Sequence, residues 1–555
     1  MDYFVNQSSL HMNRREFLLQ SALWTTVASA SWLGYRYLNR LPTVSLDKVG
    51  LPLAHALRDA QLPLAPAHEH DCDVLILGSG AAALSAAWYL AKNNQPNFLI
   101  AEGFDRNGNN AAYAFSSSLH APTGAHYLPQ PSAESSFVRE MLADLAMIQG
   151  YDAAGNPIYH ETDLVHAPDE RVWVNGTWQD GLLPQRDADS VRFFQFIQQI
   201  SHAVGTDGRK AFAMPVALSS QDEQWRKLDT LTFADWLKQQ AYQSPNLLWY
   251  LDYCCRDDYG QGIAQVSAFA GLHYFAARGN ENAAVLTWAS GLNHLSEKIR
   301  QFIGLQELPQ FPNTQQWAFK QPASVPAVAL RIQERDDVVE VTLRHTQSGD
   351  TRLVRAKKVI CAMPLMVAKR VVQNAERYGF SAHNPLPESA PWLVSQFVLH
   401  QFPNEPAKTE LAWDNVVQHS RGLGYVVATH QAIRVAKPTQ TIFTAYAALN
   451  HDTPANVRRA LLATEPRDLL DIAAQDLLTV YGGKRFWQHV SHVHITARAH
   501  AMAVPQVGYL SQPLYHALRQ HRSRLLFAHS DMSGYSVFEE AAYWGVQAAL
   551  AVLDK

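Results

Sequence analysis

A glycine turn between two apolar segments gives the strongest chemical signal in the sequence. Gly78, Gly80 and Ala83 follow directly on the apolar run 74–77, which has the length of a buried strand. Small residues at this spacing let the backbone turn tightly and approach a pyrophosphate, which the amino terminus of a following helix attracts. A second apolar run ends at Glu102, whose carboxylate can accept hydrogen bonds from a ribose. The spacing predicts a dinucleotide-binding βαβ unit.

Charged and imidazole side chains elsewhere offer acid–base chemistry. Arg256, Asp257 and Asp258 form a charged cluster in an aromatic-rich region. The arginine could hold a substrate carboxylate and the aspartates an amine, or all three could form an ion-pair network at a helix end. His126 and His529 carry the side chain that titrates nearest neutral pH, so either could act as a proton carrier. We take His126, Arg256 and Asp258 as candidate catalytic residues.

Composition narrows the class of protein. A chain of 555 residues exceeds what one hydrophobic core usually serves, so we expect two or more domains. The formal net charge of −4, without a long basic run after the N-terminus, argues against a nucleic-acid partner. The four cysteines lack metal-type spacing, and the histidines at 492, 494 and 500 bring no other ligand type with them. We therefore expect no metal.

The N-terminus resembles a bacterial export signal. Arg14 and Arg15 precede a Phe-Leu-Leu run and a weakly apolar stretch, which is the pattern of a twin-arginine signal. Small residues at 28–30 offer a cleavage site, but a retained anchor within 1–40 fits equally well. We expect a linker over 41–70 and a location in the periplasm or at the periplasmic face of the inner membrane. Membrane contact would be limited to the N-terminal segment, because no other segment is long and apolar enough to span a bilayer.

Hydrophobic periodicity predicts an α/β chain, because helical patterns and short apolar strands interleave along its length. The residues at 348–350 mark a hairpin turn. We expect helices at 190–204, 233–240, 292–303, 456–480 and 538–553, and strands at 74–77, 98–101, 328–332, 338–345, 358–363, 392–400, 424–429, 441–447 and 523–528.

Three widely separated motifs resemble the flavin-containing amine oxidase superfamily. They are the glycine turn at 78–83, the apolar strand that ends in Met363-Pro364, and the terminal segment 527–550. The loop 122–127 also resembles the Gly-Ala-His-aromatic loop that this family places beside the flavin ring. The resemblance implies a two-domain α/β fold, in which a Rossmann-type FAD-binding domain is joined to a substrate domain of mixed sheet and helices. The implied FAD-binding domain is discontinuous (71–128, 311–370 and 515–555), and the implied substrate domain comprises 129–310 and 371–514.

The resemblance also implies the FAD contacts. The glycine turn would hold the pyrophosphate, Glu102 the ribose, Val339 the adenine and Asp531 the ribityl chain. A helix N-terminus would face the flavin ring, and Tyr535 is a further catalytic candidate there. The family's Gly-Gly-Arg stands here as Arg106-Asn107-Gly108-Asn109-Asn110, which puts its phosphate contact in question. The full set of expected cofactor residues is Gly78, Ser79, Gly80, Ala82, Ala83, Glu102, Arg106, Val339, Asp531, Tyr535, Ser536 and Val537.

The resemblance implies transfer of a hydride from a substrate C–N or C–C bond to flavin N5. FAD is expected to be noncovalent, because no cysteine lies near the terminal motif. The substrate would be a small molecule such as an amine, and the electron acceptor would be oxygen or a respiratory carrier. Two alternatives stay open: a desaturase or isomerase acting on a lipophilic substrate, and a flavoprotein that binds a partner without catalysis. Carboxylates at the flavin face would favour amines, whereas a long apolar tunnel would favour lipids.

Overall fold

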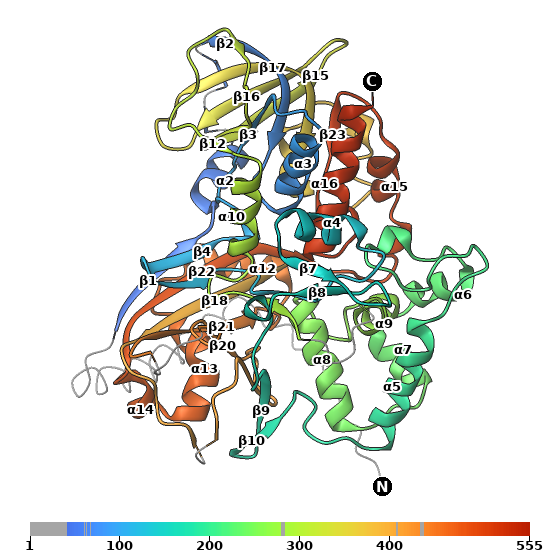
Figure 1. Cartoon of the computed structure of the whole chain (residues 1–555), viewed down its shortest axis with the longest axis vertical. Helices are drawn as coiled ribbons and strands as arrows, with labels where there is room; N and C mark the ends of the chain where they lie inside the picture. Colours follow the sequence, from blue (N-terminus) through green and yellow to red (C-terminus); the bar gives the residue numbers. More distant parts are fainter. Residues whose placement is uncertain are drawn as a thin grey trace.

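Two large β-sheets organise the chain (Figure 1). The computed structural model describes residues 42–59, 61–62, 64–66, 68–278, 284–406, 409–432 and 438–554. The twin-arginine motif at Arg14 and Arg15 lies outside these residues. In the described part, we find no helix with both the length and the apolar character needed to cross a bilayer.

The first sheet contains the expected βαβ unit. Strand β2 (His68–Leu77) leads through the glycine turn into α3 (Ala81–Lys92), and β3 (Phe98–Ala101) returns parallel to β2. A parallel return through a helix brings the carboxyl ends of β2 and β3 to the same edge of the sheet. The strand order is β12 (Gln306–Glu307), β14 (Ala323–Val325), β3, β2, β17 (Thr351–Cys361), β16 (Val339–His345) and β15 (Ala327–Glu334).

Two more elements complete this sheet and cover it. Strand β23 (Leu525–Phe527) pairs parallel with β17, and α16 (Phe538–Leu553) packs along α3. The helices approach closely because Gly545 lies against the backbone of Ala82, where an added Cβ would clash. The C-terminal segment therefore completes a unit that begins more than four hundred residues earlier in the chain.

The second sheet has eight strands and lies in the other half of the molecule. Its strand order is β1 (Thr43–Lys48), β22 (Val490–Ala503), β18 (Ser389–Leu399), β21 (Thr441–Ala448), β20 (Tyr425–Val427), β19 (Asp414–Val417), β9 (Glu170–Val174) and β10 (Thr177–Asp180). Helices α13 (Leu470–Tyr481) and α14 (Gly483–Trp487) lie with this sheet in the lower left of Figure 1, and α12 (Pro454–Ala463) packs against β18 and β22 near the centre of the view.

A group of helices stands beside this second sheet, in the lower right of Figure 1. It contains α5 (Ala188–Ser201), α7 (Phe233–Gln239), α8 (Pro245–Tyr259) and α9 (Ala268–Ala276). Helix α8 carries the charged cluster predicted at 256–258 and ends at Tyr259. Gly260 follows, and its φ of 69° suits a residue without a Cβ. The cluster therefore lies in the last turn of a buried helix.

Most predicted elements agree with the structure, and two differ in an informative way. The single helix predicted at 456–480 is wrong: α12 ends at Ala463 and α13 begins at Leu470, because Pro466 cannot continue a helix. The segment 41–70, predicted as a linker, contains β1. All six residues of β1 pair in parallel with residues of β22. The division of the chain into domains stays a prediction.

Candidate functional site

The glycine turn has the geometry that a pyrophosphate cradle requires. Gly78 has a φ of +110°, and an added Cβ would lie 2.9 Å from the carbonyl oxygen of Ala362. Gly80 is different, because an added Cβ there meets no protein atom within 4 Å. No side chain caps the amino terminus of α3, so its first N–H groups face that open space. The turn fits a bound FAD pyrophosphate at Gly80.

Hydrogen bonds fix the turn to the loop that follows β3. The hydroxyl of Ser79 donates to the carbonyl oxygens of Glu102 (2.7 Å) and Asp105 (3.1 Å). An added Cβ on Gly108 would lie 3.2 Å from the Cα of Gly80, so the loop approaches the turn from the other side. Ser79 thus positions the cradle through its side chain.

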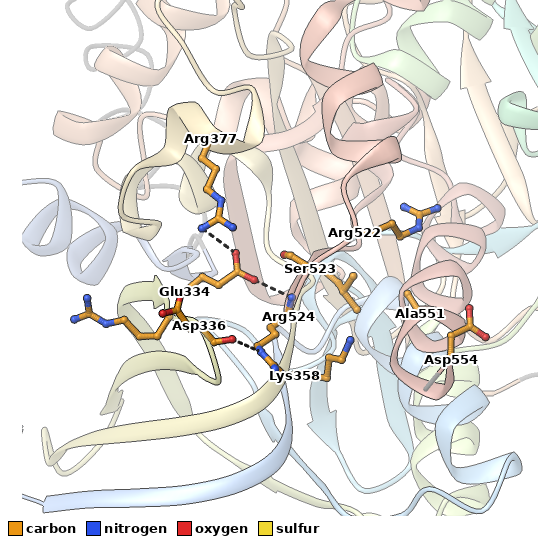
Figure 2. Close-up of a pocket in the computed structure, with 11 residues that line it drawn as sticks. Glu334, Asp336, Lys358, Arg377, Arg522, Ser523, Arg524, Ala551 and Asp554 are labelled. Atoms are coloured by element: carbon orange, nitrogen blue, oxygen red, sulfur yellow. Dashed lines mark hydrogen bonds and ion pairs between the residues drawn. The ribbon is translucent and has the colours of Figure 1, made fainter.

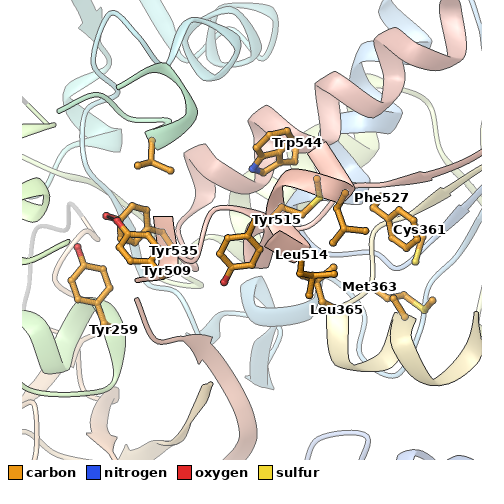
Figure 3. Close-up of a cluster of buried hydrophobic side chains, with 14 of the residues drawn as sticks. Tyr259, Cys361, Met363, Leu365, Tyr509, Leu514, Tyr515, Phe527, Tyr535 and Trp544 are labelled. Atoms are coloured by element: carbon orange, nitrogen blue, oxygen red, sulfur yellow. Dashed lines mark hydrogen bonds between the residues drawn. The ribbon is translucent and has the colours of Figure 1, made fainter. Parts of the chain in front are cut away.

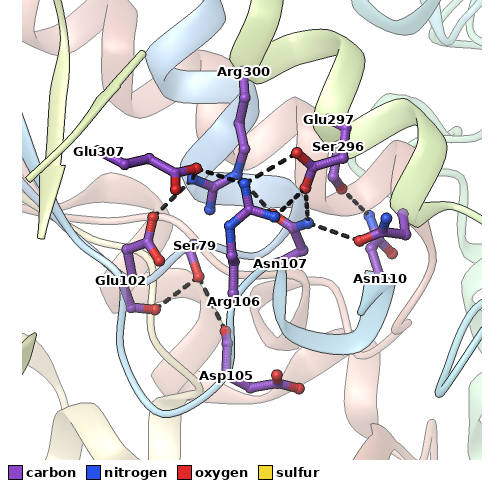
Figure 4. A network of polar contacts seen from close by, with 11 residues as sticks. Ser79, Glu102, Asp105, Arg106, Asn107, Asn110, Ser296, Glu297, Arg300 and Glu307 are labelled. Carbon is purple, nitrogen blue, oxygen red and sulfur yellow. Dashed lines mark hydrogen bonds and ion pairs between the residues drawn. The ribbon is translucent and has the colours of Figure 1, made fainter. Parts of the chain in front are cut away.

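Glu102 lies at the carboxyl edge of β3, as predicted, but it already has a charged partner. Arg300 of α10 (Asn293–Phe302) donates from Nη1 to Oε1 of Glu102 at 2.7 Å (Figure 4). The same guanidinium donates from Nε to the side chain of Asn107 at 2.8 Å. Arg300 is buried, so it holds Glu102 in one orientation and leaves Oε2 as the candidate ribose acceptor.

Arg106 does not point towards the glycine turn. Its guanidinium binds Glu297 and Glu307, with both ion pairs at 2.5 Å, and its side chain is 43% exposed (Figure 4). Both carboxylates neutralise this arginine at the protein surface. We therefore drop Arg106 as a phosphate contact.

Val339 also lies away from the cofactor edge. It pairs with Ala356, which pairs with Cys72, five residues before the end of β2. At about 3.3 Å per residue, this places Val339 roughly 16 Å from the carboxyl edge. The backbone carbonyl of Val325 instead accepts from the N–H of Glu102 at 3.0 Å, so Val325 replaces Val339 beside the ribose position.

The terminal loop brings Asp531 to the end of β17. One oxygen of Asp531 accepts from the N–H of Leu365 at 2.9 Å, and the other lies 3.3 Å from Nδ1 of His529. Burial raises the pKa of Asp531, but His529 and the backbone N–H more than offset it, so the pKa is below the ordinary value. Asp531 is an ionised, fixed carboxylate at the predicted ribityl position.

Tyr535 is a packed core residue and does not line a substrate pocket. Its side chain is 1% exposed, and its hydroxyl pairs with that of Tyr509 (Figure 3). Its ring stacks on that of His273, with the ring centroids 4.9 Å apart. The ring centroid of Tyr259 lies 5.6 Å from that of Tyr535. The catalytic role predicted for Tyr535 is therefore wrong, because no surface of its ring is left for a substrate.

The neighbouring residues keep the helix terminus open. Ser536 accepts from the N–H of Ala503 at 2.8 Å, and Val537 precedes α16 without a side-chain cap. Two buried carboxyls, Glu539 and Glu540, occupy the first turn of α16. Burial raises the pKa of Glu539 and raises that of Glu540 to about 7. The sequence analysis did not single out these two acids, because acidic residues are common in the first turn of a helix.

Backbone contacts connect the glycine turn to the 122–127 loop. Asn109 follows Gly108 in the loop against the turn, and its carbonyl accepts from the N–H of Ala125 at 2.8 Å. Gly124 lies so close to Asn109 that a Cβ would clash. Arg498 of β22 donates to the Thr123 carbonyl at 2.8 Å and so supports the loop from the second sheet. The loop that follows β3 therefore contacts both the glycine turn, through Gly108, and the 122–127 loop, through Asn109.

His126 lies among aromatic side chains. Its ring centroid is 4.9 Å from that of Tyr127, 4.5 Å from that of Tyr446 and 5.6 Å from that of Trp413. Burial lowers the pKa of His126 to about 3, so the imidazole is neutral at physiological pH. We refer to these four residues and the acids described next as the aromatic chamber.

Carboxyl groups face this chamber from two further elements. Asp257 of α8 accepts a hydrogen bond from the hydroxyl of Tyr127, and burial together with Asp258 raises its pKa to about 7. Burial and then Asp257 also raise the pKa of Asp414 in β19. Glu170, the register partner of Asp414 on β9, lies at the exposed edge. Asp257 and Asp414 thus lie against the aromatic side chains, and Glu170 is next to Asp414.

The rest of the predicted cluster is structural. Arg256 binds Asp252 one helical turn earlier at 3.0 Å and points to the carbonyl of Arg421. Asp258 binds Arg278 through both oxygens at 3.0 Å. Both arginines are largely buried, which agrees with a network at a helix end. Arg256 and Asp258 therefore pair with other residues, and Asp257 is the member of the cluster that faces the chamber.

Comparison with known proteins decides the family. The family model for flavin containing amine oxidoreductases matches residues 82–553, which is most of the chain. The protein belongs to the flavin-containing amine oxidoreductase family. It is therefore an FAD-dependent oxidoreductase, as its predicted fold and glycine turn indicated. No curated protein matches this sequence.

Solved structures share this fold. A double mutant of putrescine oxidase, made in a redesign of its cofactor binding, gives a TM-score of 0.59 at 13% identity, over 88% of this chain and 100% of that one. Cyclohexylamine oxidase from Brevibacterium oxydans IH-35A gives 0.56 at 16% identity, over 87% and 98%. A CLA-producing fatty acid isomerase from P. acnes gives 0.54 at 15% identity, over 86% and 97%. At these identities the likeness shows the shared fold alone.

The flavin family site is distinct from the open surface pocket in Figure 2. That pocket has a volume of about 590 Å³ and lies between Glu334, Lys358, Arg524 and the end of α16 at Asp554. Lys358 pairs in register with Val74, near the middle of β2 and away from the glycine turn. The FAD site predicted by the family motifs therefore lies elsewhere on the sheet, at the carboxyl end of β2.

Proposed function

We propose that this protein oxidises an amine, which it holds as a cation in the aromatic chamber. The observation that carries this proposal is the meeting of Asp257 and Asp414 beside Tyr127, Tyr446 and Trp413. Buried carboxyls attract a cation, and aromatic faces favour it further. An anionic or fully apolar substrate would leave these carboxyls without a partner.

The same acids count against the lipid alternative. A desaturase or isomerase acting on a fatty chain needs an apolar channel, and burying ionisable groups along such a channel is costly. Asp257 and Asp414 lie at the chamber, and desolvation raises the pKa of each. An ammonium group that entered would offset this cost by pairing with them.

Bound FAD would accept the hydride released from the substrate carbon. Residues of the chain prepare the substrate for that step. Above its pKa of about 7, Asp257 is ionised and can attract the ammonium form of the substrate. The amine must then lose a proton, because only a free lone pair stabilises a developing C=N bond. Asp257 or a water next to it is placed to take that proton, whereas neutral His126, with a pKa of about 3, is a weak base.

The flavin is proposed to be noncovalent. The four cysteines, at 72, 254, 255 and 361, are all buried, and none lies in the terminal loop. Burial raises the pKa of Cys361 to about 12, so its thiol is unreactive near neutral pH. We also propose twin-arginine export to the periplasm, which rests on the sequence motif at Arg14 and Arg15. Oxygen or a respiratory carrier would then reoxidise the flavin.

Anaerobic bleaching of the purified holoenzyme tests the reaction. We would add monoamines, diamines, polyamines, amino acids and a polyunsaturated fatty acid in turn and follow the loss of flavin absorbance. Bleaching by an amine and not by the fatty acid is the expected result. Bleaching by the fatty acid alone would refute the proposal, as would an unbleached flavin with every amine.

A further inference from the structure

A second pocket lies on the side of the molecule where α15 (Pro513–Gln520) meets the 205–226 region. Its volume is about 230 Å³. Its lining includes three arginines and one histidine and contains no carboxylate: Arg209, Val216, Ala217, Gln221, Arg226, Leu510, His516, Arg519 and Gln520. Protein surfaces usually intersperse charges of both signs, so a pocket with this lining is a candidate anion site.

The three guanidinium groups have no acidic partner within 4.0 Å among the described residues. Arg226 donates to the carbonyl of Leu510 at 3.2 Å, and Arg519 donates from Nε to the carbonyl of Met532 at 2.9 Å. The side chain of Arg209 is exposed at the pocket. Neutral acceptors position two of these cations. The carboxylates that act on the three arginines, Glu540, Asp229 and Asp207, lie beyond ion-pair distance.

The nearest carboxyls are already engaged elsewhere. Glu540 accepts from the N–H of Val216 at 2.5 Å and from the Ser533 hydroxyl at 2.5 Å, on the interior side of the pocket. Asp229 accepts from the N–H of Leu510 at 2.9 Å. Asp207 accepts from the N–H of Gln221 at 2.9 Å. Backbone N–H groups hold all three acids, so none of them fills the pocket.

We propose that this pocket binds a phosphate group, either as inorganic phosphate or as the phosphate of a small ester. Planar guanidinium groups match the oxygens of a phosphate, and three of them supply more charge than one carboxylate would neutralise. The volume of about 230 Å³ suits a phosphate or pyrophosphate rather than a whole nucleotide. The FAD pyrophosphate belongs to the glycine turn, so this site is a separate one.

The pocket contacts the terminal loop through Arg519. Its guanidinium donates to Met532, which follows Asp531, and lies over the ring of Trp544 at 5.4 Å. A bound phosphate would draw the same guanidinium outward. Phosphate binding would therefore shift the loop that carries Asp531. Arg519 is the residue that connects the pocket to this loop.

Isothermal titration of the FAD-loaded enzyme tests the site. Phosphate and pyrophosphate would be titrated at constant ionic strength, with chloride and succinate as comparison anions. Saturable binding of phosphate or pyrophosphate, with neither comparison anion binding as tightly, is the expected result. Absence of saturation, or succinate binding at least as tightly, would overturn the proposal.

Variants locate the binding. Arg209→Gln and Arg226→Gln should each weaken phosphate binding roughly tenfold to a hundredfold, the usual loss for a charged hydrogen bond. Arg209 makes no side-chain hydrogen bond to another described residue, so its replacement leaves the fold intact. Arg192→Gln, an exposed arginine on α5, is the matched control and should bind as the wild type does. Unchanged affinity in the Arg209→Gln, Arg226→Gln double variant would also overturn the assignment.

Discussion

The hydroxyl of Tyr127 donates a hydrogen bond to the carboxylate of Asp257. This contact joins the loop predicted beside the flavin ring to the last turn of α8, two segments far apart in the chain. Burial and Asp258 raise the pKa of Asp257, and the positive charges of Arg278 and Arg256, together with this hydrogen bond, lower it. The balance places the pKa of Asp257 at about 7, so this carboxyl changes its charge near neutral pH.

Asp257→Asn should impair amine oxidation. The variant keeps the shape of the side chain but removes its charge, so kcat/KM for amines should fall roughly tenfold to a hundredfold, the range for a lost charged hydrogen bond. Stopped-flow measurement of anaerobic flavin reduction checks this. Asp337→Asn, which removes a charge from an exposed hairpin, is the control and should reduce at the wild-type rate. Equal rates in both variants would remove Asp257 from the site.

The pH dependence of kcat/KM shows whether His126 or Asp257 is the group that titrates. Asp257 has a raised pKa of about 7, so it is neutral below that pH and anionic above it. The kcat/KM for a cationic amine should therefore rise as pH increases through about 7, and Asp257→Asn should abolish this rise. His126→Ala should slow flavin reduction yet keep the rise, because the pKa of His126 is about 3. A rise that disappears in His126→Ala would instead make the imidazole the titrating group.

Gly80→Val should lose FAD and still fold. The added side chain projects into open space and not into protein, so it would occupy the place of the pyrophosphate. The flavin-to-protein absorbance ratio of the purified variant should fall to a few per cent, while its far-ultraviolet circular dichroism stays that of the wild type. Cys361→Ser is the control. Cys361 packs within the core, so this variant should retain its flavin. Full flavin content in Gly80→Val would show that the turn is only structural.

Glu540→Gln should stabilise the protein at alkaline pH. Burial raises the pKa of Glu540 from 4.5 to about 7, so the folded state binds the proton more tightly than the unfolded state does. This contribution to stability is complete below 4.5 and is lost as pH rises through about 7. At about 1.4 kcal/mol per pKa unit, the loss is roughly 3 kcal/mol, and glutamine does not suffer it. Thermal melting at acid and alkaline pH, with exposed Glu376→Gln as control, measures the difference; an advantage for Glu540→Gln that is equal at both pH values would contradict it.

Replacement of Arg14 and Arg15 by lysine should keep the protein in the cytoplasm. Twin-arginine export recognises the paired guanidinium groups, and lysine preserves only their charge. Fractionation of cells that produce the two forms, followed by immunoblotting, checks the location. Normal periplasmic accumulation of the double variant would refute the export proposal.

The sequence alone was sufficient for the parts of this protein that depend on local patterns. The glycine turn at 78–83 and the acidic end of β3 lie within one short stretch of sequence, and close approach to a pyrophosphate restricts which residues can stand in the turn. Apolar periodicity likewise predicted α16 at its observed bounds, whereas for β2 it predicted only 74–77 and missed the start of the strand at His68. These features follow from backbone geometry and hydrophobic burial, which a short window of sequence records.

Tertiary structure decided which charged residues face the site. Arg106, Arg256 and Asp258 were candidates by type, but each is neutralised by a partner that the chain brings in from elsewhere or from the preceding turn. Asp414 and Arg300 gave no local signal, because their roles arise only when β19 meets α8 and α10 meets β3. An ionisable group acquires its function from its neighbours, through burial and pairing, and those neighbours are fixed only when the two sheets and the helices pack together.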